Sequence, residues 1–91
     1  ITYLSLRFGN GSRLKKIVLN ENELEKLDMD LRGMRYLEDL ELAGNNFSTF
    51  DFPVDMNNRI KRLNLMKNRF SDISFLNNGF KNLRVLLLGF N

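Results

Sequence analysis

The sequence contains neither cysteine nor histidine. The absence of cysteine excludes disulfide bonds, thiolate chemistry and cysteine-ligated metal sites. The absence of histidine removes the commonest metal ligand and a common general base. No nucleophile–base pair is recognisable, and the glycine-containing stretch Gly9-Asn10-Gly11 is typical of a turn rather than a phosphate-binding loop. We therefore expect no catalytic activity, no cofactor and no metal site within these residues.

Long apolar runs and blocks of like charge are also missing. The longest apolar run, Val85–Leu88, is far shorter than the roughly 20 residues of a membrane-spanning helix. The net charge is only +3, and no five consecutive residues carry the same charge. Because hydrophobic residues make up 43% of the chain, disorder is excluded as well. We expect one small folded domain and no membrane insertion.

Apolar residues recur along the chain in one fixed pattern. An apolar residue is followed by apolar residues three and five positions later, an asparagine eight later and an apolar residue ten later. Successive copies begin 23 residues apart, at Leu14, Leu37, Ile60 and Leu83, and the last copy stops at Asn91. A constant period of this length indicates a solenoid of stacked turns.

The spacing within each copy predicts a strand that is followed by a turn. Its second and third apolar residues lie two positions apart, so both point to one face of the strand. Parallel stacking of one strand per turn then buries that face and exposes the other. The asparagine lies where the chain leaves the strand, and its amide can bond backbone groups of its own turn and the next. We interpret the asparagine ladder as structural: Asn22, Asn45, Asn68 and Asn91.

Over residues 14–91 this pattern resembles the leucine-rich repeat family, whose consensus is LxxLxLxxNxL, with a partial copy at Ile1, Leu4 and Leu6. The resemblance implies an α/β solenoid, a right-handed superhelix with a parallel concave β-sheet and irregular or 3₁₀ convex arcs. Three-residue apolar spacings and Pro53 favour short 3₁₀ turns over long helices in the arcs. The arc residues expected to fill the core are Leu24, Leu27, Leu31 and Met34, then Phe47, Phe50, Phe52 and Val54 or Met56, then Phe70, Ile73, Leu76 and Phe80.

The beginning of the chain departs from the period, because Ile1 lies only 13 residues before Leu14. One explanation is a β-hairpin cap that turns at Asn10-Gly11 and pairs Leu4 with Ile17. The other is a normal repeat that is followed by a gap of about ten residues, judged by the period of its neighbours. Because the chain starts without methionine and stops just after an apolar strand, we expect residues 1–91 to be one solenoid fragment of a longer protein.

Charges alternate across the exposed side of the expected sheet. Lys16, Asp39 and Arg62 occupy equivalent positions of neighbouring strands, which favours lateral ion pairs over recognition of a charged partner. Asp39 and Glu41 lie on the same side, and we interpret them as ionised ion-pair partners rather than metal ligands. They also interrupt the basic stripe that nucleic-acid binding would need, so we expect no nucleic-acid partner.

We expect another protein to bind the concave sheet face, as in other solenoids. The last copy offers three apolar residues, Val85, Leu87 and Phe90, that would be exposed and mark a contact surface. Self-association through the open repeat ends is an alternative. The protein-binding candidates are Val85, Leu87, Phe90, Met66, Tyr3, Asp39, Glu41, Arg62 and Lys16.

Two glycosylation sequons, at Asn10 and Asn46, favour a secreted or extracellular protein. The irregular arcs resemble those of extracellular leucine-rich repeats, in the style of secreted insect immune proteins and Toll-like receptor ectodomains. The sequence thus predicts a protein-binding module of a larger secreted or cell-surface recognition protein. Innate immunity is one role that such a protein can have. The alternatives are a cytoplasmic leucine-rich-repeat scaffold or regulatory adaptor, and a spacer whose parent protein binds elsewhere.

Overall fold

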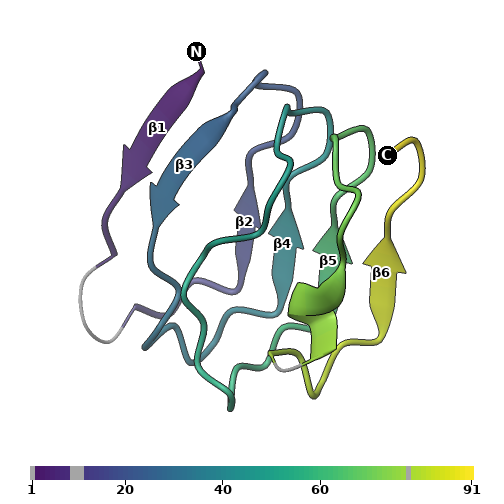
Figure 1. Ribbon diagram of the computed structural model, residues 1–91. Helices are drawn as coiled ribbons and strands as arrows, with labels where there is room; N and C mark the ends of the chain where they lie inside the picture. Colours follow the sequence, from purple (N-terminus) through teal and green to yellow (C-terminus); the bar gives the residue numbers. More distant parts are fainter. Residues whose placement is uncertain (1, 9–11, 78) are drawn as a thin grey trace.

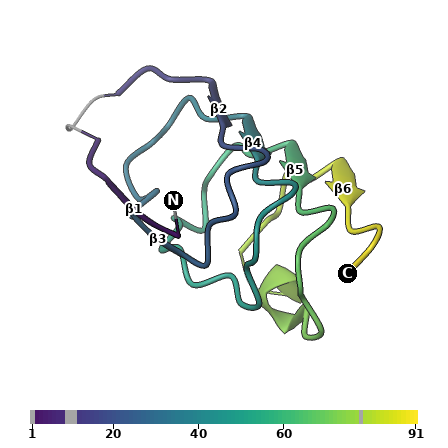
Figure 2. The ribbon, with the colours of Figure 1, turned by 90° about the horizontal axis from the view of Figure 1, so that it is seen from above.

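The computed structural model describes residues 2–8, 12–77 and 79–91 and shows a β-solenoid (Figure 1). The main sheet has four parallel strands in the order β2 (Lys16–Val18), β4 (Asp39–Glu41), β5 (Arg62–Asn64) and β6 (Val85–Leu87). Two further parallel strands, β1 (Tyr3–Leu6) and β3 (Lys26–Met29), pair on the opposite side of the coil (Figure 2). Each turn of the solenoid therefore contributes one short strand to the main sheet.

The register of the main sheet follows the sequence period. Asp39 lies opposite Lys16 on one side and opposite Arg62 on the other, and Arg62 lies opposite Val85. Backbone bonds between turns continue beyond the strands, where the N–H of Leu42 donates to the carbonyl of Asn64 at 2.9 Å. The predicted stacking of one strand per 23-residue turn is confirmed.

The return arcs contain almost no helix. The helix in the described residues is η1 (Ser74–Asn77), a single 3₁₀ turn, and no α-helix occurs in that part of the chain. Besides local turns, arc backbone groups bond the neighbouring turn, as where the N–H of Arg69 donates to the carbonyl of Phe47 at 2.8 Å. The expected irregular or 3₁₀ arcs are confirmed, but the α component of the expected α/β class is not supported.

The first strand lies in an arc and not in the main sheet. Strand β1 pairs in parallel with β3, so that Leu4 lies opposite Leu27 and Leu6 opposite Met29. The predicted hairpin, which paired Leu4 with Ile17, is therefore wrong, and its turn at Asn10-Gly11 lies outside the described residues. Because each of these partners is 23 positions away, the period is unbroken from Tyr3 onward. The short spacing before Leu14 needs neither a hairpin nor a gap in the sequence.

The core runs through the middle of the coil between the main sheet and the arcs. The leucines of the two middle copies of the pattern, such as Leu40 and Leu63, are fully buried, whereas Leu14 is exposed and those of the last copy are half-buried. Most of the arc residues expected in the core are buried or pack against it, including Val54, whereas Ile73 and Met56 are exposed. The buried core residues are Ile17, Leu24, Leu27, Met29, Leu31, Met34, Leu37, Leu40, Leu42, Phe47, Phe52, Ile60, Leu63, Leu65 and Phe70.

Ile73 is exposed because the 3₁₀ turn brings Phe75 into the core in its place. The Phe75 ring stacks on Phe50 with centroids 4.8 Å apart and contacts Phe70 at 5.9 Å. Phe50 in turn meets Phe52 and Phe80 edge to face at 4.8 and 5.6 Å. The phenylalanines of the arcs thus fill the core, as predicted, and do not form an exposed binding stripe.

The asparagine ladder joins neighbouring turns through side-chain amides. Asn45 Nδ2 donates to the carbonyls of Leu42 in its own turn and Leu19 in the preceding turn, both at 2.9 Å. Its Oδ1 accepts from the N–H of Leu24 at 2.9 Å. Asn68 and Asn91 repeat these bonds one and two turns later. The bridge reaches the preceding turn and not the following one, and Asn22, the first of the four asparagines, bonds carbonyls of its own turn.

A left-handed residue precedes every asparagine of the ladder. The φ angles are 61° at Glu21, 70° at Gly44, 56° at Lys67 and 63° at Phe90. Only Gly44 adopts this conformation without a side-chain penalty. The other three accept strain of about 1 kcal/mol or more each, and a repeated strain of this kind persists only where the surrounding bonds impose it.

Removal of a buried ladder amide should destabilise the whole solenoid. The change Asn68→Ala leaves the Leu42 and Leu65 carbonyls and the Phe47 N–H without this partner. We expect the free energy of unfolding in urea to fall by about 2–3 kcal/mol.

The matched control is Asn22→Ala at the exposed start of the ladder. Its amide nitrogen donates only within its own turn, to Leu19 and Asn20 carbonyls. This variant should lose less than about 1 kcal/mol. Equal losses in Asn22→Ala and Asn68→Ala would contradict a bridging role for the buried asparagines.

Candidate functional site

The outward side chains of the main sheet form two rows, which we call the sheet face. The first row crosses the strands through Lys16, Asp39, Arg62 and Val85. The second row crosses them through Val18, Glu41, Asn64 and Leu87. Six of the predicted candidates therefore lie together on this surface: Lys16, Asp39, Glu41, Arg62, Val85 and Leu87.

The other three candidates lie elsewhere. Tyr3 is on β1 in the two-stranded sheet, because residues 3–6 follow the frame of the arcs and not that of the strands. Phe90 lies beyond the end of β6 and is 80% exposed. Met66 is half-buried and packs beside Gly89. Its Cε lies 3.3 Å from the position that the Cβ of a larger residue at position 89 would take. The predicted apolar group of the last turn is thus divided between the sheet face and the far end of the strand.

Ion pairs cross the sheet face from strand to strand. Lys16 Nζ lies 3.6 Å from Asp39 Oδ2 and joins β2 to β4. Arg62 Nε lies 3.1 Å from Glu41 Oε2 and joins β5 to β4. The predicted lateral ion pairs are present, with the difference that Arg62 pairs diagonally with Glu41 instead of with Asp39 opposite it.

Glu41 is the centre of this polar network and is only 7% exposed. Besides Arg62, it accepts a bond from Asn64 Nδ2 at 3.3 Å, and Asn64 Oδ1 accepts the Met66 N–H at 3.1 Å. Asn64 is not among the residues that the sequence predicts for this site. Asn64 occupies the position of the repeat that Glu41 occupies one turn earlier, so an amide lies opposite a carboxylate. This pairing was the signal that could have identified it. The network fixes the polar groups in the middle of the face.

Asp39 and Glu41 influence one another's protonation. Burial raises the pKa of Asp39, and the neighbouring Glu41 carboxylate raises it further, against the opposing effect of Lys16 and Arg62. Burial acts to raise the pKa of Glu41 too, but bonds with Asp39, Asn64 and Arg62 outweigh it, and the pKa is lowered. Asp39 Oδ1 is buried and lacks a bonding partner among the described residues. The pair therefore consists of a firmly ionised Glu41 and a more easily protonated Asp39.

Apolar side chains border the polar centre on both outer strands. Val18 on β2 is 53% exposed and Val85 on β6 is 38% exposed, while Leu87 is half-buried. A protein partner could bury these side chains, and the fixed ion pairs between them would set its orientation. The described part of the chain holds no group of three potential metal-ligating side chains. The face is suited to docking.

The sequon at Asn46 lies beyond the end of β4 and outside the sheet face. Asn46 is half-buried, and its Nδ2 donates to the Glu23 carbonyl at 3.4 Å, so a glycan would have to replace that bond. Asn10 lies outside the described residues. No helix in the described ranges is long and apolar enough to cross a membrane.

Comparisons of the chain with protein-family models, with curated proteins and with solved structures found no match. The resemblance to leucine-rich repeats therefore rests on the 23-residue pattern and on the arrangement that the structure gives it.

Asp39 and Asp30 should titrate on opposite sides of the ordinary aspartate pKa. Bonds from the side chain and the backbone of Arg32 lower the pKa of Asp30 to about 2. Asp30 thus contributes stability that is present above a pH of about 4 and lost as the pH falls towards about 2. Asp39, whose pKa is raised, instead opposes folding as the pH rises above about 4. Carboxyl-carbon NMR titration measures both values.

Substitution of Glu41 separates the causes of the Asp39 shift. The change Glu41→Gln removes the neighbouring charge and frees Arg62, so the pKa of Asp39 should fall, although burial still raises it. Lys16→Met should move the same pKa upward. An Asp39 pKa at or below 3.8 in the unmodified chain would contradict this account of the pair.

Proposed function

We propose that this chain is a protein-binding leucine-rich-repeat module that docks its partner on the sheet face. The observation that carries this proposal is the composition of that face: exposed Val18 and Val85 border a network in which Glu41 and Arg62 are held in place. Apolar side chains in water are stabilised by a partner that covers them. Pre-ordered polar groups bind at a smaller entropic cost than mobile ones.

Four features support the assignment to leucine-rich repeats. These are the 23-residue period, the single short parallel strand per turn, the inward asparagine ladder and the 3₁₀ turn in the last arc. The right-handed superhelix and the concave curvature of the sheet face are part of the same proposal.

We place the chain within a larger secreted or cell-surface recognition protein, and innate immunity is one role that such a protein can have. The sequons and the extracellular style of the arcs favour this location. The second candidate is a cytoplasmic scaffold or regulatory adaptor. The half-buried state of Asn46 and its bond to Glu23 favour this second candidate, because a glycan needs a free, exposed amide. Intact mass of the native protein before and after glycosidase treatment distinguishes the two.

A photoreactive side chain on the sheet face should capture the partner. We place p-benzoylphenylalanine at Val85 on β6, and at Lys26 on the exposed side of β3 as the matched control. In the native extracellular fluid or lysate, position 85 should cross-link to one protein that position 26 does not capture. Equal labelling from both positions, or cross-links only to a second copy of the chain, would refute docking on this face.

The captured protein then provides a quantitative test. Leu87→Asp places a charge on the half-buried apolar border and should weaken binding at least about tenfold. Lys26→Asp should leave the affinity unchanged. Both variants must retain the melting temperature of the parent chain within a few degrees, and unchanged affinity in Leu87→Asp would contradict the proposal and favour a spacer role.

A further inference from the structure

Basic side chains gather along one edge of the solenoid, where the chain passes from the arcs into the main strands. We call this the strand-start edge. It contains seven of the chain's 14 lysine and arginine residues, all of them exposed, against two carboxylates, Glu38 and the pocket residue Asp55. The basic residues of this edge are Arg13, Lys15, Arg35, Arg59, Lys61, Lys81 and Arg84.

Backbone bonds show that these residues stack from turn to turn. The Lys15 carbonyl accepts the Glu38 N–H at 2.9 Å, and the Glu38 carbonyl accepts the Lys61 N–H at 2.8 Å. The Lys61 carbonyl accepts the Arg84 N–H at 2.8 Å. Side chains in this column are therefore about 4.8 Å apart, the spacing of neighbouring strands.

Glu38 neutralises only part of this charge. Its Oε1 lies 3.0 Å from Lys61 Nζ. Lys61 lowers the pKa of Glu38 most, and Lys15 and Arg59 lower it further, so several cations surround a single carboxylate. The edge remains strongly positive even though the whole chain carries only +3.

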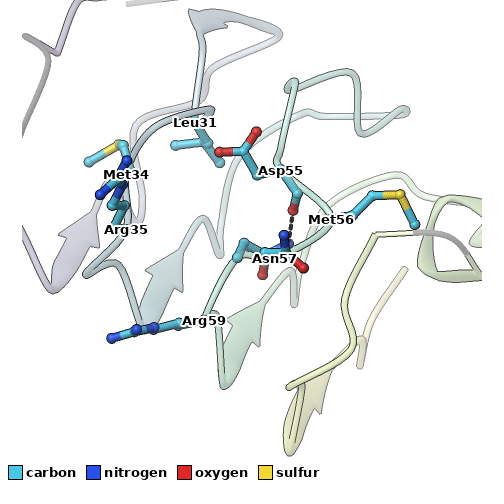
Figure 3. Close-up of a pocket in the computed structure, with 8 residues that line it drawn as sticks. Leu31, Met34, Arg35, Asp55, Met56, Asn57 and Arg59 are labelled. Atoms are coloured by element: carbon cyan, nitrogen blue, oxygen red, sulfur yellow. Dashed lines mark hydrogen bonds between the residues drawn. The ribbon is translucent and has the colours of Figure 1, made fainter.

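A pocket of about 460 Å³ opens on this edge between two neighbouring turns (Figure 3). Leu31 and Met34 contribute apolar surface from one turn, and the exposed Met56 contributes it from the next. Figure 3 shows Met34, Arg35 and Arg59 on one side of the pocket and Met56 on the other. The pocket thus combines three apolar side chains with two guanidinium groups.

Two other polar side chains of the pocket, Asp55 and Asn58, already bond backbone groups. Asp55 Oδ2 accepts the Gly33 N–H at 2.9 Å, and Asn58 Oδ1 accepts the Ile60 N–H at 3.1 Å. Among the residues that the structure describes, neither Arg35 nor Arg59 forms an ion pair. The two guanidinium groups, together with the exposed amide of Asn57, are therefore available for a ligand.

We propose that the strand-start edge binds an extended acidic segment of a protein partner, with carboxylates on Arg35 and Arg59 and an apolar side chain in the pocket beside them. Guanidinium groups suit this role because they bind carboxylates through two parallel hydrogen bonds. The remaining basic residues of the edge attract the segment from a distance. This surface is additional to the sheet face, and it deepens the proposed function by naming the chemistry of a partner.

The pocket favours an acidic peptide over a nucleic acid. A run of phosphates has no apolar side chain to place beside Met34 and Met56. The carboxylates of Asp55 and Glu38 would also repel a continuous line of phosphates. A peptide that alternates acidic and apolar residues avoids both difficulties, because its carboxylates can lie on either side of the apolar group.

The test measures binding of a fluorescein-labelled peptide, in which each of two leucines is flanked by glutamates, to the full 91-residue chain. We expect saturable binding at low salt that weakens as salt is added. The double change Arg35→Glu with Arg59→Glu should weaken it at least about tenfold. A second peptide with alanine in place of both leucines should also bind at least several-fold more weakly, because the pocket is left empty.

The control is the double change Lys26→Glu with Arg69→Glu, which alters net charge equally but lies away from this edge. It should retain the affinity of the unmodified chain, and far-UV circular dichroism should show that both double variants are folded. An equal loss in both variants would overturn the proposed site and indicate attraction by net charge alone. Equal binding of the alanine peptide, or tighter binding of single-stranded DNA of equal charge, would overturn the assignment to an acidic–apolar peptide.

Leu87→Asp distinguishes this inference from the proposed function. The substitution lies on the sheet face and should leave peptide binding intact, whereas it should weaken the partner captured through position 85. Loss of peptide binding in Leu87→Asp would overturn the assignment to the strand-start edge. Loss of peptide binding in the double arginine variant, with binding retained in Leu87→Asp, supports this assignment. That result holds whether or not the sheet face has a partner.

Discussion

The stacking of the turns depends on hydrogen bonds that join an asparagine side chain to the backbone of the preceding turn. The side chain of a buried asparagine, such as Asn45, accepts the Leu24 N–H of the turn before it and donates to carbonyls of both turns. Without it, backbone groups would be left unpaired where the chain leaves the sheet, and an unpaired buried amide is costly. The left-handed residue before each asparagine, glycine only at Gly44, shows that the chain accepts local strain to keep this bridge. One asparagine per turn thus keeps the offset between turns constant at 23 residues.

A constant offset converts sequence positions into columns on the surface, and the surface chemistry follows from those columns. Acidic residues of β4 lie between basic residues of β2 and β5, which produces the Lys16–Asp39 and Arg62–Glu41 pairs. The residues that precede each strand form the basic strand-start edge in the same way. The sheet face is nearly balanced in charge and has apolar borders, whereas the strand-start edge is unbalanced and has an apolar pocket. Two surfaces of different chemistry arise from one repeat without any additional element.

Much of this arrangement could be predicted from the sequence, because the period determines the register. The four main strands, the buried leucines, the ladder and the presence of cross-strand ion pairs all follow from positions 23 apart. The first strand was misplaced because Leu4 and Leu6, two residues apart, fit a main strand as well as an arc strand. Counting back 23 positions from Leu27 and Met29 would have resolved the ambiguity. Ile73 could not be placed, since only the 3₁₀ turn shows that Phe75 replaces it in the core. Arg62 pairs with the diagonal Glu41 and not with Asp39 opposite it. This depends on side-chain packing, which the repeat period does not determine.

Hydrogen exchange of the side-chain amides tests the central claim most directly. Well-resolved NMR signals of the asparagine Nδ2 protons report whether these groups are buried and bonded in solution. We expect the Nδ2 protons of Asn45 and Asn68 to exchange far more slowly than those of the exposed Asn22. We also expect protection of the Phe47 backbone N–H, which donates to Asn68 Oδ1. Exchange of Asn45 and Asn68 as fast as that of Asn22 would show that the turns are not held together in this way.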